Sequence, residues 1–183
     1  GGFAPFSFNV TPYLNAKGTN KLVVRVWDPT DRGFQPRGKQ VVRPEGIWYT
    51  PVTGIWQTVW IEPVAATHVA NIKSIPDVDK GIVNVTVCAA NAKAGDIVEV
   101  TILDAGRTVA TAKGLPGKAL RLNVPDAKLW SPDSPFLYDM KVAVVNAGRK
   151  IDEVDSYTAM RKLSSGRDAS GLMRLYLNTK PLF

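Results

Sequence analysis

The glutamates of this chain are the residue type best suited to paired acid and base chemistry. They are Glu45, Glu62, Glu99 and Glu153. Two carboxylates act as a catalytic pair only when the fold holds them close together in different environments. Glu62 and Glu99 lie in alternating apolar and polar stretches, whereas the other two lie in a loop and near a turn. The sequence therefore predicts separate solvated charges and no catalytic residue in this chain.

Other reactive groups are scarce. His68 is the only histidine and Cys88 the only cysteine, which excludes a Ser-His-Asp triad, a His/Cys zinc site and an internal disulfide. A glycine-rich phosphate loop is also missing from the sequence. We therefore expect neither a metal nor a cofactor.

Positive charge gathers in one loop, where Phe34 lies among four basic residues. These are Arg32, Arg37, Lys39 and Arg43, in a chain of formal net charge +7. A nucleic-acid-binding surface can have this composition, but no nucleic-acid fold motif accompanies it. We expect a solvated loop, or a face that meets an acidic part of a longer protein, and no nucleic-acid partner.

Tryptophan is concentrated in residues 46–64, which read GIWYTPVTGIWQTVWIEPV. The stretch holds three of the five tryptophans, Trp48, Trp56 and Trp60, and two copies of Gly-Ile-Trp. Tryptophans at such positions usually pack in a core or under a loop. The alternative is an aromatic surface for a sugar ring or a neighbouring domain, and the exposure of the three rings distinguishes the two.

The remaining composition is that of an ordinary globular protein, with 45% hydrophobic and 21% charged residues. No apolar run approaches the ~20 residues of a membrane span, and no segment resembles a signal peptide. We expect a soluble chain without a membrane partner. The compartment stays unknown, and a periplasmic or secreted parent protein remains open.

Alternating patterns predict an all-β chain. Residues 6–10, 22–26 and 56–62 read as strands, with a long loop after Asp28. From residue 69 to 163, about seven short strands separated by turn signals predict an immunoglobulin-like β-sandwich. Residues 163–170 read as a Ser/Gly/Asp linker. The expected sandwich core is Val83, Val85, Val98, Val100, Leu122, Tyr138, Met140 and Val142.

Several motifs in order resemble glycoside hydrolase family 2, the family of β-galactosidases, β-glucuronidases and β-mannosidases. Residues 46–64 resemble the end of its jelly-roll, sugar-binding domain, and GGFAPFSFNVT at 1–11 with KLVVRV at 21–26 resembles strands upstream of it. LWSPDSPFLY at 129–138 resembles a late segment of the immunoglobulin-like second domain. LNTKPLF at 177–183 resembles the start of the catalytic barrel.

The resemblance implies three parts. Residues 1–65 are the C-terminal part of the jelly-roll domain, 66–163 are the immunoglobulin-like sandwich, and 164–183 are a linker and the start of the barrel. It also implies a parent enzyme that hydrolyses a β-glycoside with retention, through barrel glutamates that this chain lacks. The chain itself is then a non-catalytic scaffold, inactive alone, and the sugar and linkage stay open.

The resemblance also suggests where a sugar would bind. The family has an aspartate near the position of Asp28 that reaches the substrate pocket, and Asp28, Trp48 and Trp56 are the candidate sugar-binding residues. A carboxylate suits this role because it accepts hydrogen bonds from hydroxyls. Asp28 also suits an Asx-turn, in which its side chain binds its own backbone two residues on. Both readings stay open.

The expected partners are carbohydrate, through the parent enzyme, and the absent barrel. Residues 1–64 supply about three of the ~8 strands of a jelly roll. Open strand edges and uncovered aromatics then favour self-association through residues 1–64, with partial disorder or packing on the sandwich as alternatives. The rival function is a free-standing carbohydrate-binding or adhesion-type β-sandwich module.

Overall fold

The structure is a computed structural model that describes residues 4–182. It divides into two compact units, Gly1–Ile61 and Glu62–Phe183. The first three residues of the motif at 1–11, Phe3 included, and Phe183 of the last motif lie outside the described residues.

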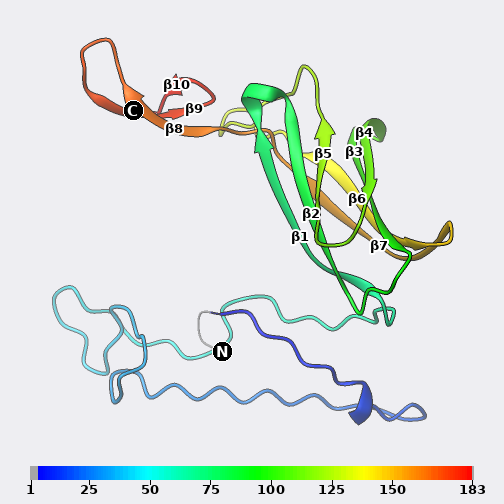
Figure 1. The fold of residues 1–183 in the computed structure, drawn as a ribbon. Helices are drawn as coiled ribbons and strands as arrows, with labels where there is room; N and C mark the ends of the chain where they lie inside the picture. The colour runs from blue at the N-terminus through cyan, green and yellow to red at the C-terminus, as the bar shows by residue number, and fades with distance from the viewer. Residues whose placement is uncertain (1–3, 183) are drawn as a thin grey trace. The chain divides into compact units, whose positions relative to one another are not determined.

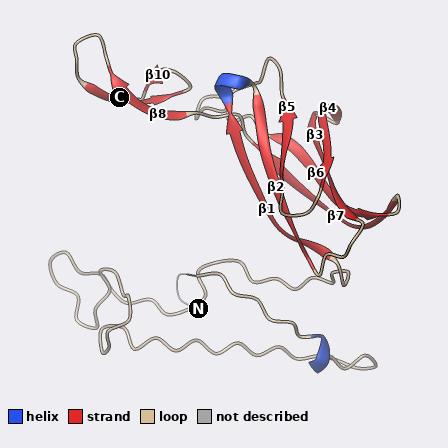
Figure 2. Ribbon diagram, viewed as in Figure 1, coloured by secondary structure: helices blue, strands red, loops and turns tan. Residues whose placement is uncertain are grey.

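The second unit contains a β-sandwich of two antiparallel sheets (Figures 1 and 2). The first sheet has the order β1-β2-β5, with β1 at His68–Asp77, β2 at Ile82–Ala90 and β5 at Ala119–Asn123. The second has the order β4-β3-β6-β7, with β3 at Asp96–Asp104, β4 at Arg107–Gly114, β6 at Tyr138–Asn146 and β7 at Arg149–Thr158. These seven strands confirm the expected all-β sandwich.

The core lies between the inward faces of the two sheets. All eight core residues expected from the alternating pattern are buried, and Val100 at the centre of β3 is fully inaccessible. The cluster also takes in residues that the pattern analysis left out of that list, which are Val87, Ile102, Leu120, Val124, Val144 and Met160. Period-2 alternation therefore identified the inward face correctly.

Two side-chain hydrogen bonds join the sheets along β1 and β7. The Asp152 carboxylate accepts the backbone N–H of Val69 at 2.8 Å, and the hydroxyls of Ser74 and Thr158 lie 2.7 Å apart. Each bond links residues more than eighty positions apart in the chain. They close one side of the sandwich, where β1 has no ladder partner beyond β2.

Tight turns connect the hairpins. Ala105-Gly106 joins β3 to β4, and Ala147-Gly148 joins β6 to β7, with φ between 47° and 80° at all four residues. These left-handed values match the right-handed twist of the flanking strands. Between β1 and β2, the single 3-10 turn η2 (Val78–Lys80) ends at Gly81, whose φ is 61°.

A third, three-stranded sheet follows the sandwich in the order β10-β9-β8. Its strands are β8 at Leu163–Arg167, β9 at Met173–Leu177 and β10 at Lys180–Pro181. The prediction of a linker at 163–170 is therefore wrong for its first half, which forms β8. Ser164, Ser165 and Gly166 have the composition of a linker, but each pairs with a residue of β9.

The first unit does not contain the strands expected at 6–10, 22–26 and 56–62. Within residues 4–61 it has one 3-10 turn, η1 (Thr11–Tyr13), and one isolated bridge between Gln40 and Tyr49. No residue from 4 to 61 is buried. The physical reason is that an extended segment becomes a strand only when a neighbour completes its hydrogen bonds, and an alternating pattern does not supply that neighbour.

Both helical elements of residues 4–182 are single 3-10 turns, so neither has the length of a membrane-spanning helix.

Candidate functional site

Asp28 ends the extended stretch before the long loop. Its Oδ1 accepts the backbone N–H of Thr30 at 2.8 Å, which is the Asx-turn, and Thr30 takes a φ of 58°. Its Oδ2 accepts the hydroxyl of Thr53 at 3.1 Å. The Asx-turn interpretation is therefore correct for this structure. Because a carboxylate has about four lone-pair positions and Asp28 is exposed, the side chain keeps acceptor capacity for a hydroxyl.

The loop from Asp31 to Val52 is held by its own polar contacts. The Asp31 carboxylate accepts the N–H of Val42 at 3.2 Å, and Gln40 Oε1 accepts the N–H of Val52 at 2.6 Å. The backbone of Tyr49 donates to Lys39 at 2.8 Å. These bonds bring together residues that are ten or more positions apart. The loop thus has a defined shape although it contains no ladder.

Trp48 lines an open hollow in this loop. The hollow has a volume of about 440 Å³, and it is lined by Asp31, Arg32, Val41, Val42, Arg43 and Trp48. The Arg37 guanidinium lies 5.7 Å from the centre of the Trp48 ring, in a cation–π arrangement. Trp48 remains 39% exposed, so the ring is available to a ligand in the hollow.

Trp56 and Trp60 are more exposed than Trp48, at 66% and 71%. The expectation that the tryptophans of 46–64 pack in a core or under a loop is therefore wrong for this chain. No side chain from residue 4 to residue 61 is buried, so these rings have no core to pack into within that part of the chain. Asp28 contacts Thr53, whereas Trp48 contacts Arg37. The two candidate sugar-binding residues therefore have different neighbours.

Glu99 and Glu153 line a second hollow, on the outer face of the four-stranded sheet. Its volume is about 270 Å³. The two residues lie on either side of Ala143, in β3 and β7. Lys113 donates to Glu99 at 2.6 Å, and Lys150 donates to Glu153. Sequence reasoning missed this juxtaposition, because it depends on both β3 and β7 pairing with β6.

The electrostatics of this hollow do not suit acid catalysis. The hydrogen bond from Lys150 lowers the pKa of Glu153 below its ordinary value. A general acid at neutral pH needs the opposite shift, which burial or a neighbouring carboxylate provides. Each of the two glutamates forms an ion pair with a lysine on the outer face of the sheet.

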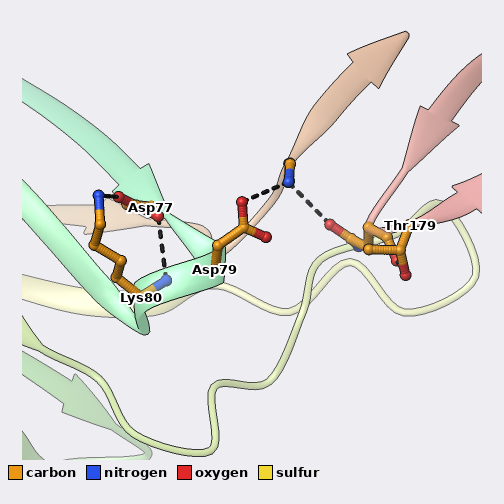
Figure 3. Close-up of polar contacts among 6 residues, drawn as sticks. Asp77, Asp79, Lys80 and Thr179 are labelled. Carbon is orange, nitrogen blue, oxygen red and sulfur yellow. Dashed lines mark hydrogen bonds and ion pairs between the residues drawn. The ribbon is translucent and has the colours of Figure 1, made fainter. Parts of the chain in front are cut away.

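A polar cluster joins the β1–β2 connection to the third sheet (Figure 3). The Asp77 carboxylate accepts the backbone and side-chain N–H groups of Lys80. The bond from the Lys80 ammonium is the main cause that lowers the Asp77 pKa, and the backbone bond lowers it further. Lys162 donates its ammonium to Asp79 and its backbone N–H to the side chain of Asn178 at 2.9 Å.

Asn178 also donates its Nδ2 to the backbone oxygen of Trp130 at 2.8 Å. This bond holds the turn between β9 and β10 against the segment of 129–138. Both segments carry motifs of the family resemblance, and the structure brings them into direct contact.

Asp168 organises the turn between β8 and β9. Its carboxylate accepts bonds from Ser170 and Leu172, and from Arg174 Nε at 2.8 Å. The Ser170 hydroxyl, followed by Arg174, lowers the Asp168 pKa to about 2. Within residues 4–182, no group of three His, Cys, Asp or Glu side chains is placed to hold a metal ion.

Sequence comparison identifies a family match over the sandwich. The profile described as "Glycosyl hydrolases family 2" matches residues 67–161. A protein of Formosa agariphila, provisionally named as a β-glucuronidase, is 28% identical over 170 aligned positions, which cover 88% of this chain and 20% of that protein. A β-galactosidase of Thermoanaerobacter pseudethanolicus is 23% identical, and the alignment covers 100% of this chain and 25% of that protein.

Solved structures show the same architecture. A β-glucuronidase from Ruminococcus gnavus superposes with a TM-score of 0.51 and 20% identity, over 65% of this chain and 20% of that one. At this identity the likeness concerns the fold. The chain spans about a fifth to a quarter of the length of the relatives it matches.

Proposed function

Because this chain belongs to glycoside hydrolase family 2, we propose that it is a non-catalytic β-sandwich portion of a retaining enzyme that hydrolyses β-glycosides in carbohydrate metabolism. The observation that carries the proposal is the state of its carboxylates. Glu99 and Glu153 are each bound by a lysine on an open sheet face. A retaining hydrolase needs two carboxyl groups ~5 Å apart, with one of them protonated.

The scaffold role rests on the contacts around Asn178. The Asn178 side chain accepts the backbone N–H of Lys162 and donates to the backbone oxygen of Trp130, and the Lys162 ammonium donates to Asp79. In the proposed parent enzyme, the third sheet leads into the catalytic barrel, and the sandwich holds the start of that barrel in place. Asp28 would then offer its remaining lone pairs to a sugar hydroxyl at the rim of the barrel pocket.

A second candidate function is favoured by the exposed rings of Trp56 and Trp60. An exposed aromatic face packs against the C–H face of a sugar, as in a free-standing carbohydrate-binding module. Binding of this chain alone to a β-glycan, lost in Trp56→Ala, would support the module. Retained binding in that variant would count against it.

The test of the main proposal is an activity assay on the 183-residue protein with nitrophenyl β-galactoside, β-glucuronide and β-mannoside. We expect no turnover above buffer. Glu45→Gln and Glu99→Gln serve as matched variants that remove one carboxylate each. Turnover that disappears in either variant would refute the non-catalytic assignment.

A further inference from the structure

The basic loop of the first unit has a composition that the scaffold role does not explain. Arg32, Arg37, Lys39 and Arg43 lie within twelve residues of one another, and the carboxylates beside them are Asp31 and Glu45, so positive charge remains in excess over residues 31–45. Charges of one sign in a concave surface attract a ligand of the opposite sign. The loop is therefore suited to an anion.

Two of these arginines line the hollow and have no ion-pair partner among residues 4–182. They are Arg32 and Arg43, and both are exposed. Arg37 is engaged differently, since it donates to the backbone oxygen of Asp31 at 3.2 Å and lies over Trp48. An arginine fork binds a planar carboxylate or a sulfate through paired N–H groups.

The same hollow also has an aromatic wall and a suitable size. Trp48 presents part of its ring to it, and the volume of about 440 Å³ is in the range of small-molecule sites. An aromatic ring and two arginines around one hollow match a pyranose that carries one anionic substituent. A nucleic acid would need a longer track of phosphate contacts than this one hollow provides.

We propose that Arg32 and Arg43, with Trp48, form a binding site for a sugar that carries a carboxylate or sulfate group. The guanidinium groups bind the anion, and the indole packs against the sugar ring. The contacts of Asp31 and Gln40 hold the loop in shape before the ligand arrives, which reduces the entropy lost on binding. The choice of a sugar rests on the proposed function, whereas the choice of an anion rests on the loop itself.

The experiment is an NMR titration of the complete 183-residue protein that follows the indole N–H signal of Trp48. The chain has five tryptophans, and Trp48→Phe identifies the signal by its loss. The ligands are sodium glucuronate, galactose 6-sulfate, glucose as the same ring without charge, and acetate as the charge without the ring. We expect one of the two anionic sugars to bind at least about tenfold more tightly than glucose and acetate, roughly the effect of one charge-assisted hydrogen bond. The tighter of the two identifies the anionic group.

Variants locate the site. Arg32→Gln with Arg43→Gln should reduce the preference for the charged sugar to less than about threefold, because the paired charge-assisted bonds are lost. Arg121→Gln, an exposed arginine of β5 in the sandwich, is the matched control and should leave the preference unchanged. Both arginines of the hollow are exposed, so their replacement should not unfold the loop.

Several results would overturn the proposal. They are equal binding of glucuronate, galactose 6-sulfate and glucose, binding of acetate as tight as that of the anionic sugars, or an equal loss in Arg121→Gln. Binding of a short oligothymidylate at Trp48 without binding of the anionic sugars would assign the loop to nucleic acid instead. If the titration fails while the chain shows no glycosidase turnover, only this inference fails. Turnover by the chain itself would refute the proposed function whatever the titration shows.

Discussion

Val100→Asp tests the sandwich core most directly. Val100 is fully inaccessible at the centre of β3, opposite Ala112 of β4 and Val142 of β6. An aspartate there has no polar partner, so it must become protonated when the chain folds. Raising its pKa from about 3.9 to above 7 costs about 1.4 kcal/mol per unit, or about 4 kcal/mol at neutral pH. The lost valine methyl groups add about 1.5 kcal/mol.

This cost is comparable to the whole stability of a domain, about 5–15 kcal/mol. The assay is urea or thermal unfolding of the complete chain, followed by circular dichroism. We expect the melting temperature to fall by at least about 15 °C, since 1 kcal/mol shifts a domain of this size by about 4–8 °C. The folded pKa of the new carboxyl lies above its unfolded value, so the loss should be smallest below about pH 4 and grow as the pH rises.

Two controls separate charge from size and position. Val100→Ala removes the methyl groups without adding a charge and should cost about 2 kcal/mol. Thr111→Asp places the same carboxylate on the exposed face of β4 and should change stability by less than about 0.5 kcal/mol. A melting temperature of Val100→Asp within a few degrees of the parent chain would refute the core assignment.

Two further predictions concern the other parts of the chain. The Asp168 pKa is lowered to about 2, so its support of the β8–β9 turn should be complete above about pH 4 and lost as the pH falls through 2; carboxyl NMR shifts would follow this, and an Asp168 titration near pH 4 would contradict it. The full chain should self-associate in light scattering, whereas a version starting at Ala66 should not, because the apolar side chains of residues 4–61 are uncovered; two monomers at high concentration would argue against it.

The sandwich was predictable because its signal is local. Val83 and Val85 alternate with polar residues, and the buried side chains follow that alternation. The first strand, β1, was not singled out from the sequence. Its register shifts near its start, between Val69 and Asn71, which breaks the period of two there. Farther along, the half-buried positions hold Ser74 and Pro76 while Ile75 is exposed, so the apolar residues do not mark the inward face.

The strands predicted within residues 4–61 are absent for a different reason. The alternation of Phe6 and Phe8 with polar residues is as regular as that of β2, yet no ladder forms there. A period of two describes which side chains would share a face, but a strand also needs backbone partners, and those partners are not specified by the segment itself.

The candidate site was only partly predictable for the same reason. Asp28 and Trp48 were identified by residue type and by resemblance, and the clustering of basic residues was visible in the sequence. That Arg32 and Arg43 share a hollow with Trp48 depends on the bond between Asp31 and Val42. A contact across eleven positions of irregular loop has no periodic signal.

The turns at Ala105-Gly106 and Ala147-Gly148 bear on how the sandwich folds. Each places an alanine at a φ near 50°, where asparagine or glycine is the usual residue and where a β-carbon costs about 1–2 kcal/mol. Only the second residue of each turn is a glycine, so each turn favours closure less than an Asn-Gly or Gly-Gly turn does. We therefore expect the β3–β6 pairing, which joins residues up to 50 positions apart, to form together with the hairpins. Domains whose contacts are mostly nonlocal fold slowly, in about milliseconds to seconds, and we expect this sandwich to fold on that timescale.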